Sequence, residues 1–302
     1  MKFEDMINTI INDDCLNILK DIPDGSIDAI ITDPPYLYLK NQKLERPFDE
    51  EKFFNEAKRV LKDTGFIVLF GRGTSFYRWN TILARLDFEF KEELIWNKRR
   101  VSTIFNAIAR IHETISIHCK GKGTINVCKV PYIEMRKYDT KAIVDDIKRI
   151  LSTINNPQNL KELMKYIETG NLDFNKDIES KHHTSLGKAK TYNRNIRTYR
   201  MIENGLQEKS IIEIQGEHYK MQHPTQKPIE LLKRIIPLVT AENDIVLDCF
   251  SGSGTTCVAA KELGRRFIGI EIDPEYHKIS LDRLNGILAN GQISFDTDIS
   301  KL

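Results

Sequence analysis

The sequence lacks the cysteine spacing of a metal site or of a disulfide framework. Its 302 residues include five cysteines, and no two of them form a Cys-x-x-Cys pair. Neither a zinc site nor a dithiol redox motif is therefore indicated. Unpaired thiols of this kind are typical of proteins in a reducing, cytosol-like compartment. We expect free cysteines and no metal ion.

Long hydrophobic runs are also missing. No stretch is apolar over the roughly 20 residues that a membrane-spanning helix needs. Residues 1–14 mix polar and apolar side chains and contain no signal-peptide core. These absences predict a cytoplasmic protein that does not interact with membranes.

The chain has no large excess of one charge either. Lys and Arg number 45 against 43 Asp and Glu, which gives a formal net charge of +2. Any nucleic-acid partner must then be bound by a local basic patch rather than by the whole surface. With 40% hydrophobic and 29% charged residues, the composition suits one large α/β core with an added module.

Strand and helix patterns alternate along both ends of the chain, which favours a doubly wound, mostly parallel sheet. We expect a loop at 37–50 and helical periodicity over 140–168, broken at Asn155-Asn156-Pro157. The expected strands lie at 9–15, 27–31, 66–70, 88–96, 114–119, 244–248 and 267–272. Helices are expected from residue 16, over 53–61, from about 231 to 236 and over 258–263.

The segment 32–36, Thr-Asp-Pro-Pro-Tyr, directly follows the apolar strand at 27–31. Two prolines fix φ and remove two backbone donors, so this corner presents the Asp33 carboxylate, the Pro34 carbonyl and the Tyr36 ring together. Two acceptors suit an exocyclic amino group, and the ring suits the face of the base that carries it. The alternative is that Pro34 and Pro35 merely end the strand while Asp33 caps a turn.

A second strand, at 244–248, leads into the small-residue loop 250–254 and then into a helix. Glu271 follows about twenty residues later, where an acid accepts hydrogen bonds from ribose hydroxyls. Cys257 replaces the third glycine of the dinucleotide pattern. Asp248 would repel a pyrophosphate and attract an ammonium group. The ligand that combines a ribose, an adenine and an amino acid without phosphate is S-adenosylmethionine.

The region 121–220 differs in texture and is interpreted as an inserted module. Its segment 181–200 is basic and contains no acidic residue, with aromatic and Asn side chains among the charges. Such a mixture suits phosphate contacts together with base readout. The alternative is a solvated basic face. The candidate DNA-binding residues are Lys188, Lys190, Arg194, Arg197 and Arg200.

Three motifs, in this order, resemble those of the beta group of DNA amino-methyltransferases. They are the corner at 33–36, His-Pro-Thr-Gln-Lys-Pro at 223–228, and Phe-Ser-Gly-Ser-Gly at 250–254. The resemblance covers about residues 8–120 and 221–285. It implies a seven-stranded Rossmann-like sheet with permuted motif order. The domains would be a catalytic half at 1–120, a target-recognition region at 121–220 and a cofactor-binding half at 221–302.

The resemblance also implies the site residues. Asp33, Pro34, Pro35 and Tyr36 would be catalytic. Lys227 would reach the cofactor carboxylate, and Asp14 with Cys15 would contact the adenine ring, unless Cys15 is only a small core residue. The residues expected to bind S-adenosylmethionine are Asp14, Cys15, Asp33, Thr225, Lys227, Asp248, Phe250, Ser251, Gly252, Ser253, Gly254, Thr255, Glu271 and Ile272.

The implied activity is site-specific methylation of N6 of a flipped adenine in double-stranded DNA. Cytosine N4 methylation uses the same chemistry, but Asp33 stands where such families more often carry Ser. The missing Pro-Cys dipeptide argues against methylation of the cytosine ring. An RNA or small-molecule methyltransferase and an inactive DNA-binding regulator stay open as different functions. The resemblance indicates a bacterial, archaeal or phage protein and leaves open a homodimer and a cognate restriction endonuclease.

Overall fold

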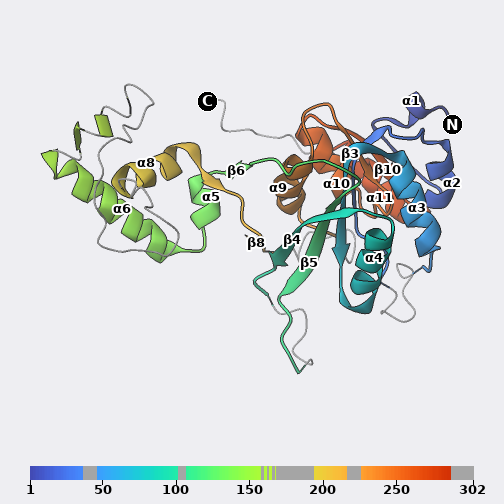
Figure 1. Cartoon of the computed structure of the whole chain (residues 1–302), viewed down its shortest axis with the longest axis horizontal. Coiled ribbons are helices and arrows are strands. Elements are labelled where there is room, and N and C mark those ends of the chain that lie inside the picture. Colours follow the sequence, from blue (N-terminus) through green and yellow to red (C-terminus); the bar gives the residue numbers. More distant parts are fainter. Residues whose placement is uncertain are drawn as a thin grey trace. The chain divides into compact units, whose positions relative to one another are not determined.

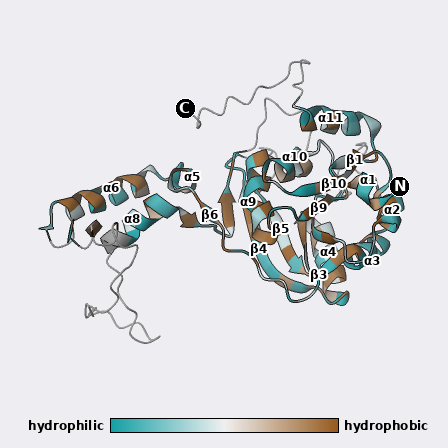
Figure 2. Cartoon of the chain, turned by 90° about the horizontal axis from the view of Figure 1, so that it is seen from above, coloured by the Kyte–Doolittle hydropathy of each residue, from teal (hydrophilic) through white to brown (hydrophobic). Residues whose placement is uncertain are grey.

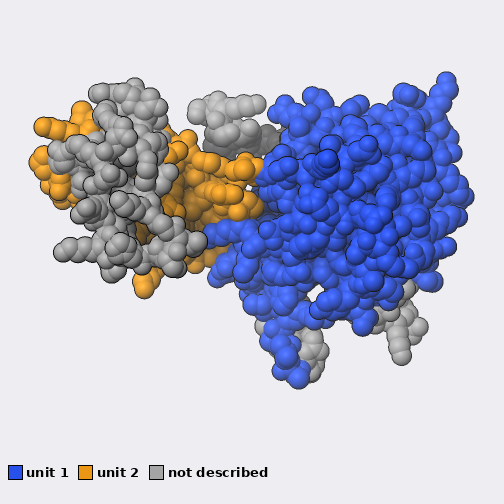
Figure 3. Space-filling view, in the orientation of Figure 1, with its two compact units in different colours: residues 1–126, 209–302 blue, residues 127–208 orange. Residues whose placement is uncertain are grey.

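The computed structural model describes residues 1–36, 46–100, 107–157, 194–215 and 226–286, with isolated positions between 160 and 167. The chain divides into two compact units (Figure 3), one formed by residues 1–126 with 209–302 and the other by 127–208. The expected target-recognition region, 121–220, includes the whole second unit. It also includes a strand that belongs to the first. The loop expected at 37–50 falls mostly outside the described residues.

The first unit is built on one eight-stranded sheet. Its strand order is β1-β10-β9-β2-β3-β5-β4-β8, and β5 runs antiparallel to both of its neighbours while the other pairs are parallel. The strands are β1 (Thr9–Ile11), β2 (Ile27–Thr32), β3 (Leu61–Gly71), β4 (Glu89–Asn97), β5 (His112–Cys119), β8 (Ile211–Glu213), β9 (Ile245–Asp248) and β10 (Arg266–Ile270). The predicted doubly wound, mostly parallel α/β class is thus confirmed. The seven expected strands are present, and β8 adds an eighth at the edge of the sheet.

Helices cover both faces of this sheet. Figure 2 shows α9, α10 and α11 on one side and α3 and α4 on the other. The helical elements of the first unit (Figure 1) are α1 (Phe3–Met6), α2 (Cys15–Ile18), the 3-10 turn η1 (Leu19–Asp21), α3 (Glu50–Val60), α4 (Gly73–Arg85), α9 (Ile229–Val239), α10 (Thr255–Glu262) and α11 (Pro274–Leu284). The strand expected at 9–15 ends earlier, because Asp14 caps α2 and Cys15 begins it.

The carboxyl ends of three adjacent strands, β10, β9 and β2, carry three acidic residues. Strands β2 and β9 are buried on both faces along almost their whole length, as the apolar composition of a central parallel strand requires. From β9 the chain passes through α10 to β10, and from β2 it passes through α3 to β3, on opposite sides. Such a switch point opens a crevice at the carboxyl ends of the strands. Asp33, Asp248 and Glu271 lie at these ends.

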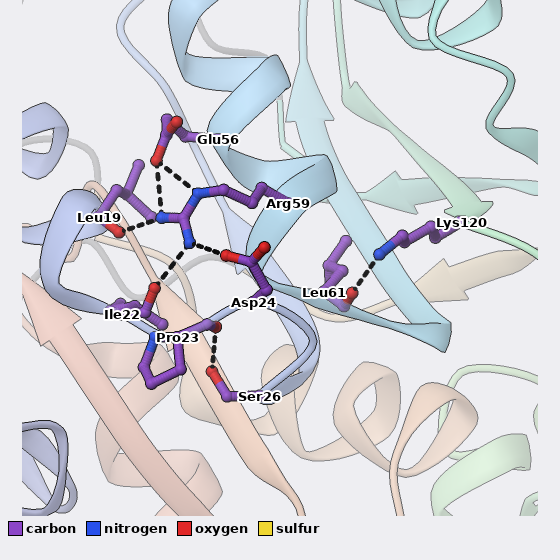
Figure 4. Close-up of polar contacts among 9 residues, drawn as sticks. All are labelled: Leu19, Ile22, Pro23, Asp24, Ser26, Glu56, Arg59, Leu61 and Lys120. Atoms are coloured by element: carbon purple, nitrogen blue, oxygen red, sulfur yellow. Dashed lines mark hydrogen bonds and ion pairs between the residues drawn. The ribbon is translucent and has the colours of Figure 1, made fainter.

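Arg59 on α3 ties the turn after α2 to the core (Figure 4). Its guanidinium donates to the carbonyls of Leu19 and Ile22, at 2.6 and 2.9 Å, and forms ion pairs with Glu56 and Asp24. The hydrogen bond with Glu56, which outweighs burial, raises the pKa of Arg59. One side chain therefore satisfies backbone acceptors of a segment that carries little regular hydrogen bonding of its own.

The second unit contains a short antiparallel ribbon and helices. Tyr132 donates to the buried Asp146 at 2.9 Å, and Arg149 pairs with the same carboxylate at 2.6 Å. Burial, followed by the hydrogen bond to Asp146, raises the pKa of Tyr132 to about 12. The elements are β6 (Lys129–Val130), α5 (Tyr132–Arg136), α6 (Thr140–Ile154), α8 (Arg194–Asn204) and β7 (Leu206–Gln207).

Candidate active site

The Asp33 carboxylate stands just beyond β2 and is contacted by two side chains. The Tyr36 hydroxyl donates to Asp33 Oδ1, and the Lys227 ammonium donates to Asp33 Oδ2. Lys227 is 194 positions away in the sequence and lies just before α9. The structure therefore brings the corner at 33–36 together with Lys227 of the motif at 223–228, of which it describes residues 226–228.

Tyr36 is held from two directions. Ser75, near the start of α4, donates its hydroxyl to the Tyr36 carbonyl at 2.7 Å. The Tyr36 ring lies 5.9 Å from the ring of the fully buried Trp79, tilted by 46°. Tyr36, the last residue of the corner, is consequently held against α4. No role for Ser75 or Trp79 was apparent from the sequence.

Lys227 also faces a second carboxylate, that of Glu113 on β5. Its Nζ lies 3.2 Å from Glu113 Oε2, and Lys98, which directly follows β4, binds the same Glu113 side chain. Burial by itself would raise the pKa of Glu113, but the charges of Lys227 and Lys98 outweigh it and hold that pKa at about 2. Burial likewise opposes the charge on Lys227, and the two carboxylates more than offset it, which raises the pKa of Lys227.

In the structure the Lys227 ammonium contacts Asp33 and Glu113. Its contact with the cofactor carboxylate, which the resemblance implied, stays a prediction. Glu113 and Lys98 were not found from the sequence. A charged residue at the entrance to a strand expected to be apolar was the one available signal for Glu113.

The loop at 250–254 needs glycine at two positions. Gly252 and Gly254 have φ of 50° and 73°, values that favour glycine. A Cβ on Gly254 would also lie 2.8 Å from the Cβ of Ser280 on α11. Arg283, on the same helix, donates to the Ser253 carbonyl at 2.6 Å and to the hydroxyls of Ser253 and Thr255 at 2.8 Å each. Helix α11 thus packs against the loop at Gly254 and holds it through the hydrogen bonds of Arg283.

Glu271 closes the loop on its other side. Its two carboxylate oxygens accept from the backbone N–H groups of Gly252, at 2.7 Å, and Asp273, at 2.8 Å. Burial raises the pKa of Glu271, and the two backbone hydrogen bonds act in the opposite direction. Each carboxylate oxygen has a further lone pair, so Glu271 can still accept hydrogen bonds from a ligand.

Asp248 lies at the end of β9 and is also buried. Its Oδ1 accepts from the Thr32 hydroxyl at 2.8 Å and from the Phe250 N–H at 3.2 Å. Burial raises the pKa of Asp248 to about 6, although hydrogen bonds from Thr256, Thr32 and Phe250 lower it. An ionised Asp248 therefore depends on these donors or on a nearby cation.

The remaining expected cofactor residues that the structure describes lie in this loop, directly after Glu271 or at the start of α2. The Phe250 ring packs 5.0 Å from Phe48 and 5.3 Å from Phe53, and Ile272 is 43% exposed directly after Glu271. Asp14 accepts from the Leu16 N–H at 2.8 Å as the N-cap of α2. Cys15 is buried in the hydrophobic core, and burial raises its pKa to about 12. Ser251 is buried, and its hydroxyl has no hydrogen-bond partner among the described residues.

Several expected contacts lie outside the described residues, namely Thr225, Lys188 and Lys190. Arg194 begins α8, with its side chain not described, whereas Arg197 and Arg200 are exposed on that helix. Within the described ranges there is no group of three or more His, Cys, Asp or Glu placed to hold a metal ion. No helix in the described part of the chain is long and apolar enough to cross a membrane.

The fold is shared with solved DNA methyltransferases. The crystal structure of the M1.HpyAVI–SAM complex matches with a TM-score of 0.53 at 23% identity, covering 91% of this chain and 98% of that one. The PvuII DNA methyltransferase, described as cytosine-N4-specific, matches with a TM-score of 0.55 at 15% identity, covering 91% and 85%. At these identities the likeness concerns the fold alone.

Sequence relatives and a family model identify the protein family. The Type II methyltransferase M.HinfI of Haemophilus influenzae is 30% identical, over 95% of this chain and 70% of its own length. M.BglII of Bacillus subtilis, another Type II methyltransferase, is 28% identical over 93% and 69%. The family model described as DNA methylase, which unites the N6 and N4 types, matches residues 27–282. The chain therefore belongs to this family of DNA methyltransferases.

Proposed function

We propose that this enzyme transfers a methyl group from S-adenosylmethionine to the exocyclic N6 of a flipped adenine in double-stranded DNA. The observation that carries the proposal is the hydrogen bond between Thr32 and Asp248. It fastens the segment that leads into the Asp33 corner to the acid that leads into the glycine loop. A base amino group held at Asp33 would therefore lie beside a ligand held by the loop.

The residues of the loop fit S-adenosylmethionine. Two acids, Asp248 and Glu271, flank it, which suits an ammonium group and ribose hydroxyls and disfavours a pyrophosphate. The buried Ser251 hydroxyl has a hydrogen bond to give, and Ile272 offers an exposed apolar side chain for the adenine ring. The M1.HpyAVI neighbour, which shares the fold, was crystallised with SAM. When bound, this cofactor supplies an electrophilic methyl group on a sulfonium.

The Asp33 corner would act on the target base. Extruding an adenine from the duplex costs a few kcal/mol. Asp33 and the Pro34 carbonyl would accept its two amino hydrogens, while Pro35 keeps the turn extended and Tyr36 stacks on the base. Acceptors on both hydrogens favour a pyramidal nitrogen whose lone pair can attack the methyl group. The Tyr36 hydroxyl donates to Asp33 Oδ1 in the structure. When a base binds, this hydroxyl would either share Oδ1 with the base amino group or give up the hydrogen bond.

The rest of the reaction needs only positioning and a proton acceptor. The nitrogen–carbon bond forms as the carbon–sulfur bond breaks, and sulfur keeps that electron pair. The methylated amino nitrogen then loses a proton to Asp33 or to water. Holding both reactants in line supplies much of the rate enhancement. No covalent enzyme intermediate is required.

The choice of adenine rests on Asp33, because cytosine-N4 families more often carry Ser at this place. The PvuII neighbour shares the fold and is named as N4-specific, so methylation of cytosine N4 is the second candidate. A direct assay separates them. Labelled S-adenosylmethionine is incubated with DNA or with RNA, and the nucleosides are identified by mass spectrometry. We expect N6-methyladenine in DNA. N4-methylcytosine would overturn the adenine assignment, and no transfer to DNA would reject the function.

The proposed target-recognition region remains 121–220, which includes the second unit, 127–208, and α8 carries the exposed Arg197 and Arg200 that would contact DNA. A cognate restriction endonuclease stays a prediction, which the Type II names of the relatives favour. A homodimer also stays a prediction, and light scattering of the purified protein would test it.

A further inference from the structure

Four charged side chains form a chain of ion pairs that leads away from Asp33 into the sheet. Lys227 bridges Asp33 and Glu113, and Lys98, which directly follows β4, also binds Glu113. The Lys227 and Glu113 side chains are only 11% and 13% exposed. The Lys227 ammonium also lies 5.2 Å from the centre of the Phe70 ring, on β3. The cluster joins Lys98 and Glu113, which are 15 positions apart, with Asp33 and Lys227, which are 194 positions apart.

The geometry divides the Lys227 ammonium between two carboxylates. An ammonium has three donors on a flexible stem, so a single carboxylate does not fix its direction. Glu113 lies near the start of β5, where it pairs with Trp96 of β4, and the next residue, Thr114, is paired on both sides, with β3 and with β4. Glu113 is a rigid point from which Lys227 can be held against Asp33 Oδ2. Held in this way, the Asp33 carboxylate keeps lone pairs that can accept a hydrogen bond from the base.

We propose that Glu113 is a positioning residue for methyl transfer, which acts by holding Lys227 against Asp33. This inference rests on the proposed function of the corner. Glu113 touches neither the base nor the cofactor in this mechanism, so its effect passes through Lys227. The contact with the cofactor carboxylate that the resemblance implied for Lys227 is a separate prediction, on which this inference does not depend.

The charge of Glu113 matters as well as its place. During transfer, positive charge moves from sulfur to the amino nitrogen beside Asp33. The Lys227 cation stands close to that nitrogen and would oppose the new charge. Glu113 neutralises Lys227, so the cluster of two cations and two anions carries no net charge. Without Glu113 the cluster would be positive, and the transition state would lose more than the bound ground state.

Glu113→Gln tests this, because it keeps the shape and removes the charge. We expect kcat to fall roughly 10- to 100-fold while KM for S-adenosylmethionine changes less than about threefold. The alkaline limb of the pH profile should also move to lower pH, since Lys227 loses one of the anions that keep it protonated. Glu93→Gln, an exposed position on β4, is the matched control and should behave as the wild type. An unchanged kcat and pH profile in Glu113→Gln would overturn the proposal.

A conservative variant and a double variant test whether Glu113 acts through Lys227. If Glu113→Gln does not fold, Glu113→Asp is the second variant. It keeps the negative charge but moves the carboxylate away from Lys227 by one methylene group, and it should lower kcat with a wild-type pH profile. Unchanged kcat in that variant would equally overturn the inference. In the Lys227→Met background, Glu113→Gln should have little further effect on kcat, whereas independent effects would contradict action through Lys227.

A titration separates this inference from the proposed function. NMR of the 15N-labelled Lys227 ammonium needs no methyl transfer and should show a lower pKa in Glu113→Gln than in the wild type. A wild-type protein that methylates no DNA would reject the proposed function. Equal Lys227 titrations in the two proteins would reject the role of Glu113.

Discussion

The Thr32 hydroxyl donates to Asp248 Oδ1 at 2.8 Å, across 216 positions of sequence. Both residues are buried, and they end the neighbouring parallel strands β2 and β9. The bond therefore fixes the relative position of the two segments that follow, the Asp33 corner and the glycine loop. It also helps to keep a buried carboxylate ionised.

Asp248 should reduce stability at neutral pH. Its pKa in the fold is about 6, raised by burial from an ordinary 3.8, so the folded protein binds its proton more tightly than the unfolded chain. The destabilisation is complete above about pH 6 and disappears as the pH falls below about 4. It amounts to roughly 3 kcal/mol at most. Asp248→Asn should therefore be more stable than the wild type toward urea at pH 8, by a margin that shrinks at pH 5. A margin independent of pH would contradict this.

Glu271→Ala should weaken cofactor binding. A ribose held in the crevice would lose a charged acceptor worth roughly 1.5–3 kcal/mol. Calorimetry with S-adenosylmethionine measures the loss directly. Glu275→Ala, at an exposed position on α11, is the control and should bind as the wild type does. Equal affinity in the Glu271 variant would remove this carboxylate from the cofactor site.

Arg59→Met should destabilise the first unit. The buried carbonyl of Ile22 would lose its guanidinium donor, and the ion pairs with Glu56 and Asp24 would disappear (Figure 4). We expect a loss of about 2 kcal/mol in urea unfolding. Lys58→Met removes the adjacent cation, whose 3.9 Å pair is with an exposed Asp87, and should cost under about 0.5 kcal/mol. Equal losses would show that Arg59 acts only as a surface charge.

The basic segment should set the salt dependence of DNA binding. Replacing Arg194, Arg197 and Arg200 together by Gln should weaken binding and reduce the slope of log K against log salt. The reduction should be roughly one for each phosphate that the variant no longer neutralises. Titrations at several salt concentrations measure both quantities. The triple variant of the exposed Lys2, Lys20 and Lys52 is the control for net charge. The same slope in both variants would leave the segment as a solvated basic face.

The sheet could be predicted from the sequence because its central strands are continuous apolar runs. The runs at 27–31, 66–70 and 245–248 lie in β2, β3 and β9, buried on both faces. Strand β8 could not be predicted. It has three residues, too few to show an alternation of apolar and polar side chains, and it is a strand because it pairs with β4.

The acids of the site could be predicted for the same reason, since they end apolar strands or follow them. Their partners could not. Glu113 meets Lys227 only through the pairing of β5 in the sheet, and Arg283 reaches Ser253 only through the packing of α11. Sequence spacing carries no information about contacts of this range. Lys227 shows the limit most clearly, because its motif was recognised and its partner was not.

Methyl transfer by Asp33→Ala is the most direct test of the proposed mechanism. Asp33 faces the base amino group and not the sulfonium, so the variant should bind S-adenosylmethionine within about threefold of the wild type. Losing this preorganised acceptor should lower the transfer rate by on the order of 10²–10³ or more. The measurement is single-turnover transfer of labelled methyl to duplex DNA, beside calorimetry of cofactor binding. A fully active Asp33→Ala enzyme would contradict the mechanism.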